Sequence, residues 1–144
     1  MRISLLHGPN LNLLGQREPS LYGSRSFLDL VASVRAYAQQ RGLAVQDFQT
    51  NDEAAMLDYV HRLSPSDWVI LNAGAWTHTS VALRDALAGV GAPFVEVHLS
   101  QVHARESFRH RSYLSARARA VIAGFGDLGY QRAIDYIAAQ SVAS

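Results

Sequence analysis

SDWVILNAGAWTHTSVALRDALAGVGAPFVEVHLS, residues 66–100, contains one strand–helix–strand unit. Trp68–Leu71 and Phe94–Leu99 are short apolar runs with the composition of strands that are buried on both faces. Between them, Ser80 to Leu87 has helical spacing, and two glycines follow it. Two strands joined through a helix are typical of a parallel sheet.

The same alternation continues on both sides of this unit. Further strands are predicted over Ile3–Leu6, Val45–Gln49 and Val121–Phe125, and further helices over residues 27–38, 56–63 and 130–137. The predicted order is β-α-β-α-β-α-β-α-β-α, which indicates an α/β fold with a five-stranded parallel sheet and helices on both faces. Val45–Gln49 is the most polar strand, and the flavodoxin-like order 2-1-3-4-5 places it at an edge. The length suits a single domain, 1–144.

Composition excludes several classes of chemistry. The chain has no Cys, which rules out disulfides and thiolate ligands. All 13 basic residues are Arg, so Schiff-base catalysis and a Walker A site, which both need Lys, are excluded. The net charge of +1 does not favour binding to nucleic acid or a membrane. No apolar run reaches membrane-spanning length, and we expect a cytoplasmic protein without a cofactor or metal.

Polar side chains gather where the predicted interior strands end. The first strand runs towards Asn10, the third ends at Asn72 with His78 beyond it, and the fourth contains Glu96 and His98. Glu96 and His98 are two positions apart, so they share one face of the strand. Either His98 is a core histidine held by a carboxylate, or it is an acid–base group at the ligand-binding edge of the sheet.

The segment Gly8–Gly23 is long for a connection between a strand and a helix, and long loops in compact domains are usually functional. It contains Arg17 and Tyr22. Tyrosine is a poor base unless its pKa of about 10 is lowered, which a nearby Arg can do. The pair is therefore either a catalytic base with its activator or part of a solvated surface loop.

Three other patterns favour structural roles. Gly124, Gly126 and Gly129 form a GxGxxG run, but no strand follows, so a tight turn is expected rather than a dinucleotide site. The spacing of His98, His103 and His110 does not match a zinc motif. The basic run 105–119 is interspersed with Ser and Ala, as in a solvated face, although Arg109 is well placed to reach a ligand.

Three segments resemble the signatures of one enzyme family: HGPNLNLLGQREPSLYG (7–23), NAGAWTHTSVALRDA (72–86) and EVHLSQVHARESFRHRSYLS (96–115). In order and spacing they are similar to type II 3-dehydroquinate dehydratases. The resemblance implies a flavodoxin-like fold, a homododecamer built from trimers, and dehydration of 3-dehydroquinate to 3-dehydroshikimate through an enolate, without metal, cofactor or Schiff base. It is equally compatible with aromatic amino acid biosynthesis by the shikimate pathway and with quinate breakdown.

The resemblance also implies roles for single residues. Tyr22 would take the proton from carbon 2 and Arg17 would keep Tyr22 partly ionised, while Asn10 would hold a water that stabilises the enolate. His98, oriented by Glu96, would protonate the departing hydroxyl. The substrate would be bound by Asn72, His78, Arg109, the backbone N–H of Leu99, Ser100 and, from a neighbouring subunit, Asp85. Arg105 matches a family arginine without a clear role.

Some positions depart from the family pattern. His7 and Gln101 stand where the family often has Asn, and Trp76 replaces a smaller side chain. None of these carries the expected chemistry.

The alternative from another class is a flavodoxin-like binding or signalling module. A receiver domain needs an acidic cluster after the first strand and a Lys, and this sequence has neither. An FMN-binding protein needs a phosphate-binding loop rich in Ser and Thr after the first strand, and the sequence has no such loop.

Overall fold

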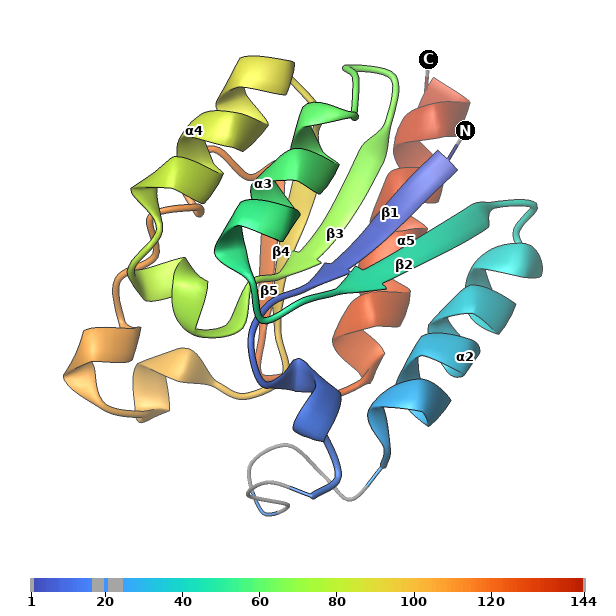
Figure 1. Cartoon of the computed structure of the whole chain (residues 1–144). Coiled ribbons are helices and arrows are strands. Elements are labelled where there is room, and N and C mark those ends of the chain that lie inside the picture. The colour runs from blue at the N-terminus through green and yellow to red at the C-terminus, as the bar shows by residue number, and fades with distance from the viewer. Residues whose placement is uncertain (1, 17–19, 21–24, 144) are drawn as a thin grey trace.

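A five-stranded parallel sheet forms the centre of the molecule in the computed structural model, which describes residues 2–16, 20 and 25–143 (Figure 1). The strands are β1 (Arg2–His7), β2 (Ala44–Gln49), β3 (Trp68–Asn72), β4 (Phe94–His98) and β5 (Ala120–Ala123). Their order is β2-β1-β3-β4-β5, and every neighbouring pair is parallel. The predicted fold class is confirmed, and the polar β2 lies at an edge as expected.

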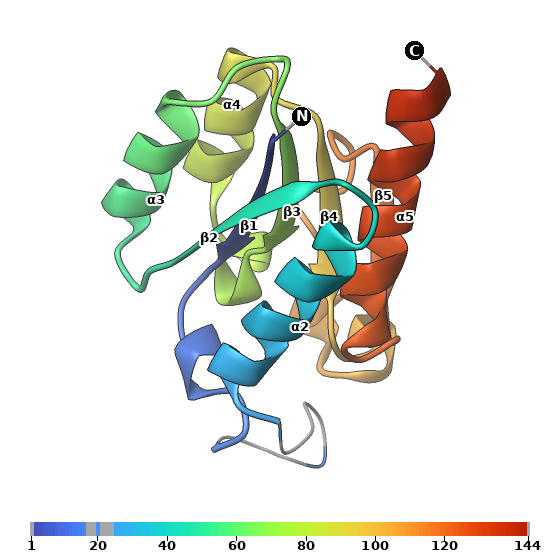
Figure 2. The same cartoon turned by 90° about the vertical axis from the view of Figure 1, so that its right-hand side faces the viewer.

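Helices cover both faces of the sheet. α2 (Phe27–Gln39) and α5 (Leu128–Ala143) lie on one face, and α3 (Glu53–His61) and α4 (Val81–Val90) lie on the other (Figures 1 and 2). Each layer buries its own apolar cluster against the sheet. Three helices begin at side-chain caps, because Ser26, Asp52 and Ser80 each accept a hydrogen bond from a backbone N–H of the first turn.

The connection from β4 to β5 differs from the prediction. It contains no α-helix, but two 3₁₀-helices, η3 (Val102–Ala104) and η4 (Ser107–Arg109). Arg, Ser and His dominate this segment, so it lacks the apolar periodicity that would pack an α-helix onto the sheet. The predicted β-α alternation is therefore wrong at this one step.

The last strand is shorter and more exposed than predicted. β5 ends at Ala123 because Gly124 adopts a φ of 86°. As an edge strand it leaves Val121 48% exposed, and Phe125, which was expected within it, is 58% exposed. The glycine run is a tight turn, as expected, in which the N–H groups of Gly124 and Gly126 donate to the carbonyls of His98 and Leu99. In the part of the chain that the structure describes, no helix is long and apolar enough to cross a membrane.

Candidate active site

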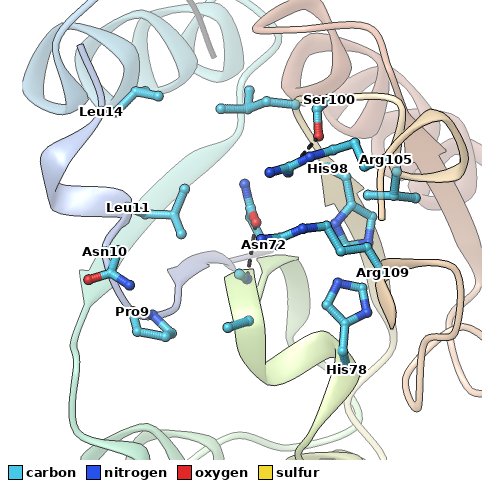
Figure 3. Close-up of a pocket in the computed structure, with 14 residues that line it drawn as sticks. Pro9, Asn10, Leu11, Leu14, Asn72, His78, His98, Ser100, Arg105 and Arg109 are labelled. Carbon is cyan, nitrogen blue, oxygen red and sulfur yellow. Dashed lines mark hydrogen bonds between the residues drawn. The ribbon is translucent and has the colours of Figure 1, made fainter. Parts of the chain in front are cut away.

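A pocket opens at the carboxyl ends of β1, β3 and β4, where open α/β sheets bind their ligands (Figure 3). The loop after β1, the turn after β3 and the segment after β4 supply its walls. Seven of the eleven residues predicted for the site line it: Asn10, Asn72, His78, His98, Leu99, Ser100 and Arg109. Leu11, Leu14 and Val102 add apolar surface.

His98 and Glu96 form a buried pair at the end of β4. The Nε2 of His98 lies 2.5 Å from Oε2 of Glu96, and the two side chains are 8% and 1% exposed. Because a carboxylate only accepts hydrogen bonds, Nε2 carries the proton in this pair. A second proton can then be held or released only at Nδ1. The pair thus has the arrangement of an oriented acid–base histidine.

Two serines hold the other oxygen of Glu96. Ser115 Oγ donates to Oε1 at 2.7 Å and Ser112 Oγ donates at 3.2 Å. Burial raises the pKa of Glu96, but the hydrogen bond and charge of His98 and the hydrogen bonds from both serines outweigh this effect, so the pKa is below its ordinary value. Glu96 is therefore a carboxylate at neutral pH, as the pairing with His98 requires.

His78 is oriented by the backbone. Its Nδ1 lies 2.7 Å from the carbonyl oxygen of Arg111 and must donate to it. In a neutral ring, Nε2 is then an acceptor, which suits a ligand hydroxyl. The rings of His78 and His98 are stacked with centroids 6.5 Å apart, so both histidines serve the same part of the pocket.

The β1 and β3 loops meet in a close approach that shapes the pocket floor. A Cβ on Gly8 would overlap the carbonyl oxygen of Ala73 and lie 2.6 Å from its carbonyl carbon. Asn10 has a φ of 70°, a left-handed conformation that Asn tolerates better than most residues. Its backbone N–H donates to Asn51 Oδ1 at 3.0 Å. This contact fixes Asn10 at the pocket wall and leaves its side chain available.

Arginines and a serine form the wall that comes from the segment after β4. Arg105 donates through Nη1 to Ser100 Oγ at 3.2 Å (Figure 3). Arg109 is held by Glu106, whose Oε1 accepts from Nε at 2.8 Å. Guanidinium groups with hydroxyl and backbone donors nearby suit a carboxylate or a polyhydroxylated ligand.

The other predicted residues divide into three cases. Glu96 does not line this pocket but lines a second cavity, together with His98, Ser112 and Ser115. Asp85 is exposed on α4 and does not line the pocket of its own chain. Arg17 and Tyr22 lie outside the described residues. The described residues contain no group of three or more His, Asp and Glu side chains that could hold a metal ion.

Sequence reasoning missed the residues that support the site from behind. Ser112 and Ser115 lie in a segment without periodicity, and nothing in the sequence linked them to Glu96. Tyr130 was expected only as a core residue of the last helix, although its hydroxyl receives a hydrogen bond from Asn72. These contacts join residues far apart in the chain, so only the fold reveals them.

Comparisons with known proteins agree with this geometry. The family model described as dehydroquinase class II matches residues 1–138. A 3-dehydroquinate dehydratase of Synechococcus sp. (strain WH7803) is 54% identical, over 94% of this chain and 92% of the relative. The "Catabolic 3-dehydroquinase 2" of Neosartorya fischeri is 53% identical, over 93% and 90%. The crystal structure of type II dehydroquinase from Propionibacterium acnes superposes with a TM-score of 0.92 at 41% identity, covering 96% of both chains. The chain belongs to the class II dehydroquinase family.

Proposed function

We propose that this protein is a type II 3-dehydroquinate dehydratase, a hydro-lyase that converts 3-dehydroquinate to 3-dehydroshikimate. The observation that carries the proposal is the Glu96–His98 pair at a pocket that also presents Asn72, His78 and Arg109. That pocket lies at the edge of the sheet where such folds bind ligands. The family and its similar relatives support the choice of substrate.

The reaction requires a base, a group that stabilises the enolate and an acid. Tyr22, which Arg17 keeps partly ionised, takes the proton from carbon 2, next to the ketone, and an enolate forms. When the enolate collapses, the bond between carbon 1 and its hydroxyl breaks, and His98 Nδ1 gives that hydroxyl a proton so that water leaves. A double bond then joins carbons 1 and 2. No Lys is available for an imine route.

Glu96 and Asn10 assist these two proton transfers. A histidine protonated on both nitrogens is a cation, and the buried carboxylate of Glu96 stabilises it through the contact with Nε2. Asn10 positions a water on the enolate oxygen, where donors are most effective because negative charge develops there. Tyr22 then releases to solvent the proton that it took, and His98 gains one from solvent, so both groups return to their starting states.

The remaining pocket residues bind the substrate. Asn72 and Arg109 donate hydrogen bonds to the ring hydroxyls, and His78 Nε2 accepts one. Ser100 and the backbone N–H of Leu99 receive the carboxylate, and the proximity of Arg105 to Ser100 supports this placement. The donors and acceptors that these residues present to the pocket support the roles that the family resemblance implies.

We also propose that the chain, as one catalytic domain, assembles into a homododecamer of trimers in the cytoplasm. Asp85 then enters the pocket of a neighbouring subunit, and its exposed position away from its own pocket supports this arrangement. Light scattering should give twelve times the chain mass of 15.8 kDa. An active species of monomer mass would contradict the proposed assembly.

The direct test of the activity is to add 3-dehydroquinate and record ultraviolet absorbance. The product contains a double bond conjugated with both the ketone and the carboxylate, and it absorbs where the substrate does not. Wild type should produce this absorbance and His98→Asn should produce it far more slowly. A folded wild type without turnover would favour the alternative of a binding module.

A further inference from the structure

Behind the pocket, three polar side chains form a buried chain of hydrogen bonds. Asn72 Nδ2 donates to Tyr130 Oη at 3.0 Å, and Tyr130 Oη lies 2.8 Å from His7 Nε2. Tyr130 and His7 are 0% exposed and Asn72 is 4% exposed. Asn72 lines the pocket, whereas the other two side chains do not.

The direction of donation along this chain follows from the chemistry of its ends. Gly74 N–H donates to Asn72 Oδ1 at 3.3 Å, which identifies the carbonyl end of the carboxamide and leaves Nδ2 facing Tyr130. A hydroxyl that accepts from Asn72 has its own hydrogen left to donate. His7 Nε2 receives it, so His7 is the final acceptor.

Burial keeps His7 in the form that this role needs. Burial lowers the pKa of His7 to about 3, so the ring stays neutral over the ordinary pH range. Nδ1 then carries the proton, and this atom is buried without a hydrogen-bond partner among the described residues. An unpaired buried N–H is destabilising. The contact of Nε2 with Tyr130 Oη is the one hydrogen bond of this ring among the described residues.

Hydrogen bonds hold the Asn72 carboxamide at both its oxygen and its nitrogen. Its oxygen is held by Gly74 and one Nδ2 hydrogen by Tyr130. Among residues 2–16, 20 and 25–143, no protein acceptor takes the second Nδ2 hydrogen, and the side chain borders the pocket. A carboxamide that could rotate would present either an acceptor or a donor to the ligand, whereas this one is restricted to a single orientation.

We propose that Tyr130 and His7 are positioning residues, which hold the Asn72 carboxamide so that it donates to a ring hydroxyl of the substrate. The inference rests on the proposed function, because it assigns a donor role to Asn72 in that reaction. Neither residue touches the substrate. Their effect passes through Asn72, and this gives the proposal a specific test.

The test is a double-mutant cycle on turnover of 3-dehydroquinate with Tyr130→Phe, Asn72→Ala and the double variant. Tyr130→Phe should raise KM roughly 3- to 10-fold, the size expected for one lost hydrogen bond, and leave kcat within about twofold. In the Asn72→Ala background the same change should alter KM less than about twofold. Equal effects in both backgrounds would show a merely structural role and overturn the proposal.

Tyr59→Phe is the matched control. Tyr59 is also buried, and its hydroxyl bonds to Ser4 Oγ at 3.1 Å, but it lies in the other helix layer and does not line the pocket. This variant should lose stability without a rise in KM. If its KM rises as much as that of Tyr130→Phe, the effect is general loosening of the core and the proposal fails.

Two variants of His7 separate hydrogen bonding from packing. His7→Gln keeps an acceptor near the position of Nε2 and should keep KM within about twofold, whereas His7→Phe removes the acceptor and should raise KM as Tyr130→Phe does. Equal KM values for the two would overturn the role of His7. Wild type without any turnover would instead overturn the proposed function, and this inference with it.

Discussion

His7 should make the protein less stable as the pH falls below neutral. Its pKa is lowered from an ordinary value of 6.5 to about 3 by complete burial. Between these two values the unfolded chain binds one proton more than the folded chain, so stability rises with pH. The contribution is complete above about pH 6.5 and is lost as the pH falls towards 3.

The size of the effect follows from this difference in proton binding. Each pH unit in that range changes the free energy of unfolding by about 1.4 kcal/mol, and from pH 7 to pH 5 the loss is about 2 kcal/mol. His7→Gln has no ring to protonate and should lose little over the same interval. The pKa of Glu96 is also lowered, but from an ordinary value of 4.5, so Glu96 changes the free energy of unfolding mainly below about pH 5.

The measurement is urea unfolding of wild type and His7→Gln at pH 7 and pH 5, at one protein concentration because assembly contributes to stability. His61→Gln is the control: it removes an exposed histidine, and it shows how much the loss of one imidazole alone changes the pH dependence of the free energy of unfolding. If wild type and His7→Gln lose the same free energy between the two pH values, His7 is not a buried neutral histidine and the reasoning is refuted.

Other consequences of the site can be measured in the same way. His98→Asn should reduce kcat by about 10²–10⁴-fold while binding of a substrate analogue, followed by calorimetry, stays near wild type; near-normal kcat would return His98 to a core role. Tyr22→Phe should be nearly inactive at every pH in the absorbance assay, and substantial activity would mean another base. Gly8→Ala should lower the free energy of unfolding by about 1–3 kcal/mol, because its Cβ would overlap the Ala73 carbonyl; unchanged urea unfolding would show that the two loops can separate.

The strand order could be predicted because the relevant signals are local. Each interior strand is a short apolar run, and β2 is visibly more polar than the others. The β4–β5 connection could not be predicted in the same way. Its 3₁₀-helices are held by single hydrogen bonds, such as those that η4 makes through Arg109 and Glu106, and these leave no periodic pattern. The end of β5 depended on the backbone of Gly124, which the apolar run to Phe125 concealed.

The site was predictable to the extent that its residues follow strands. The strands contain Asn72, Glu96 and His98, so the alternation of side chains along a strand and the order of the strands bring these residues to one edge of the sheet. The supporting contacts depend on distance in space instead. Tyr130 is 123 positions from His7, and only the packing of α5 against the sheet brings them together. Resemblance to a family indicated roles for Arg17 and Tyr22, which lie outside the described residues.

The buried polar side chains at the edge of the sheet stabilise the fold and the site through the same hydrogen bonds. Glu96 forms hydrogen bonds with both His98 and Ser115, and Tyr130 forms hydrogen bonds with both His7 and Asn72. Removing one member therefore leaves a buried partner unpaired, which is more costly than the loss of the bond itself. Because each shared partner touches a pocket residue, a substitution at Glu96 or Tyr130 changes the orientation of that residue as well as the free energy of unfolding.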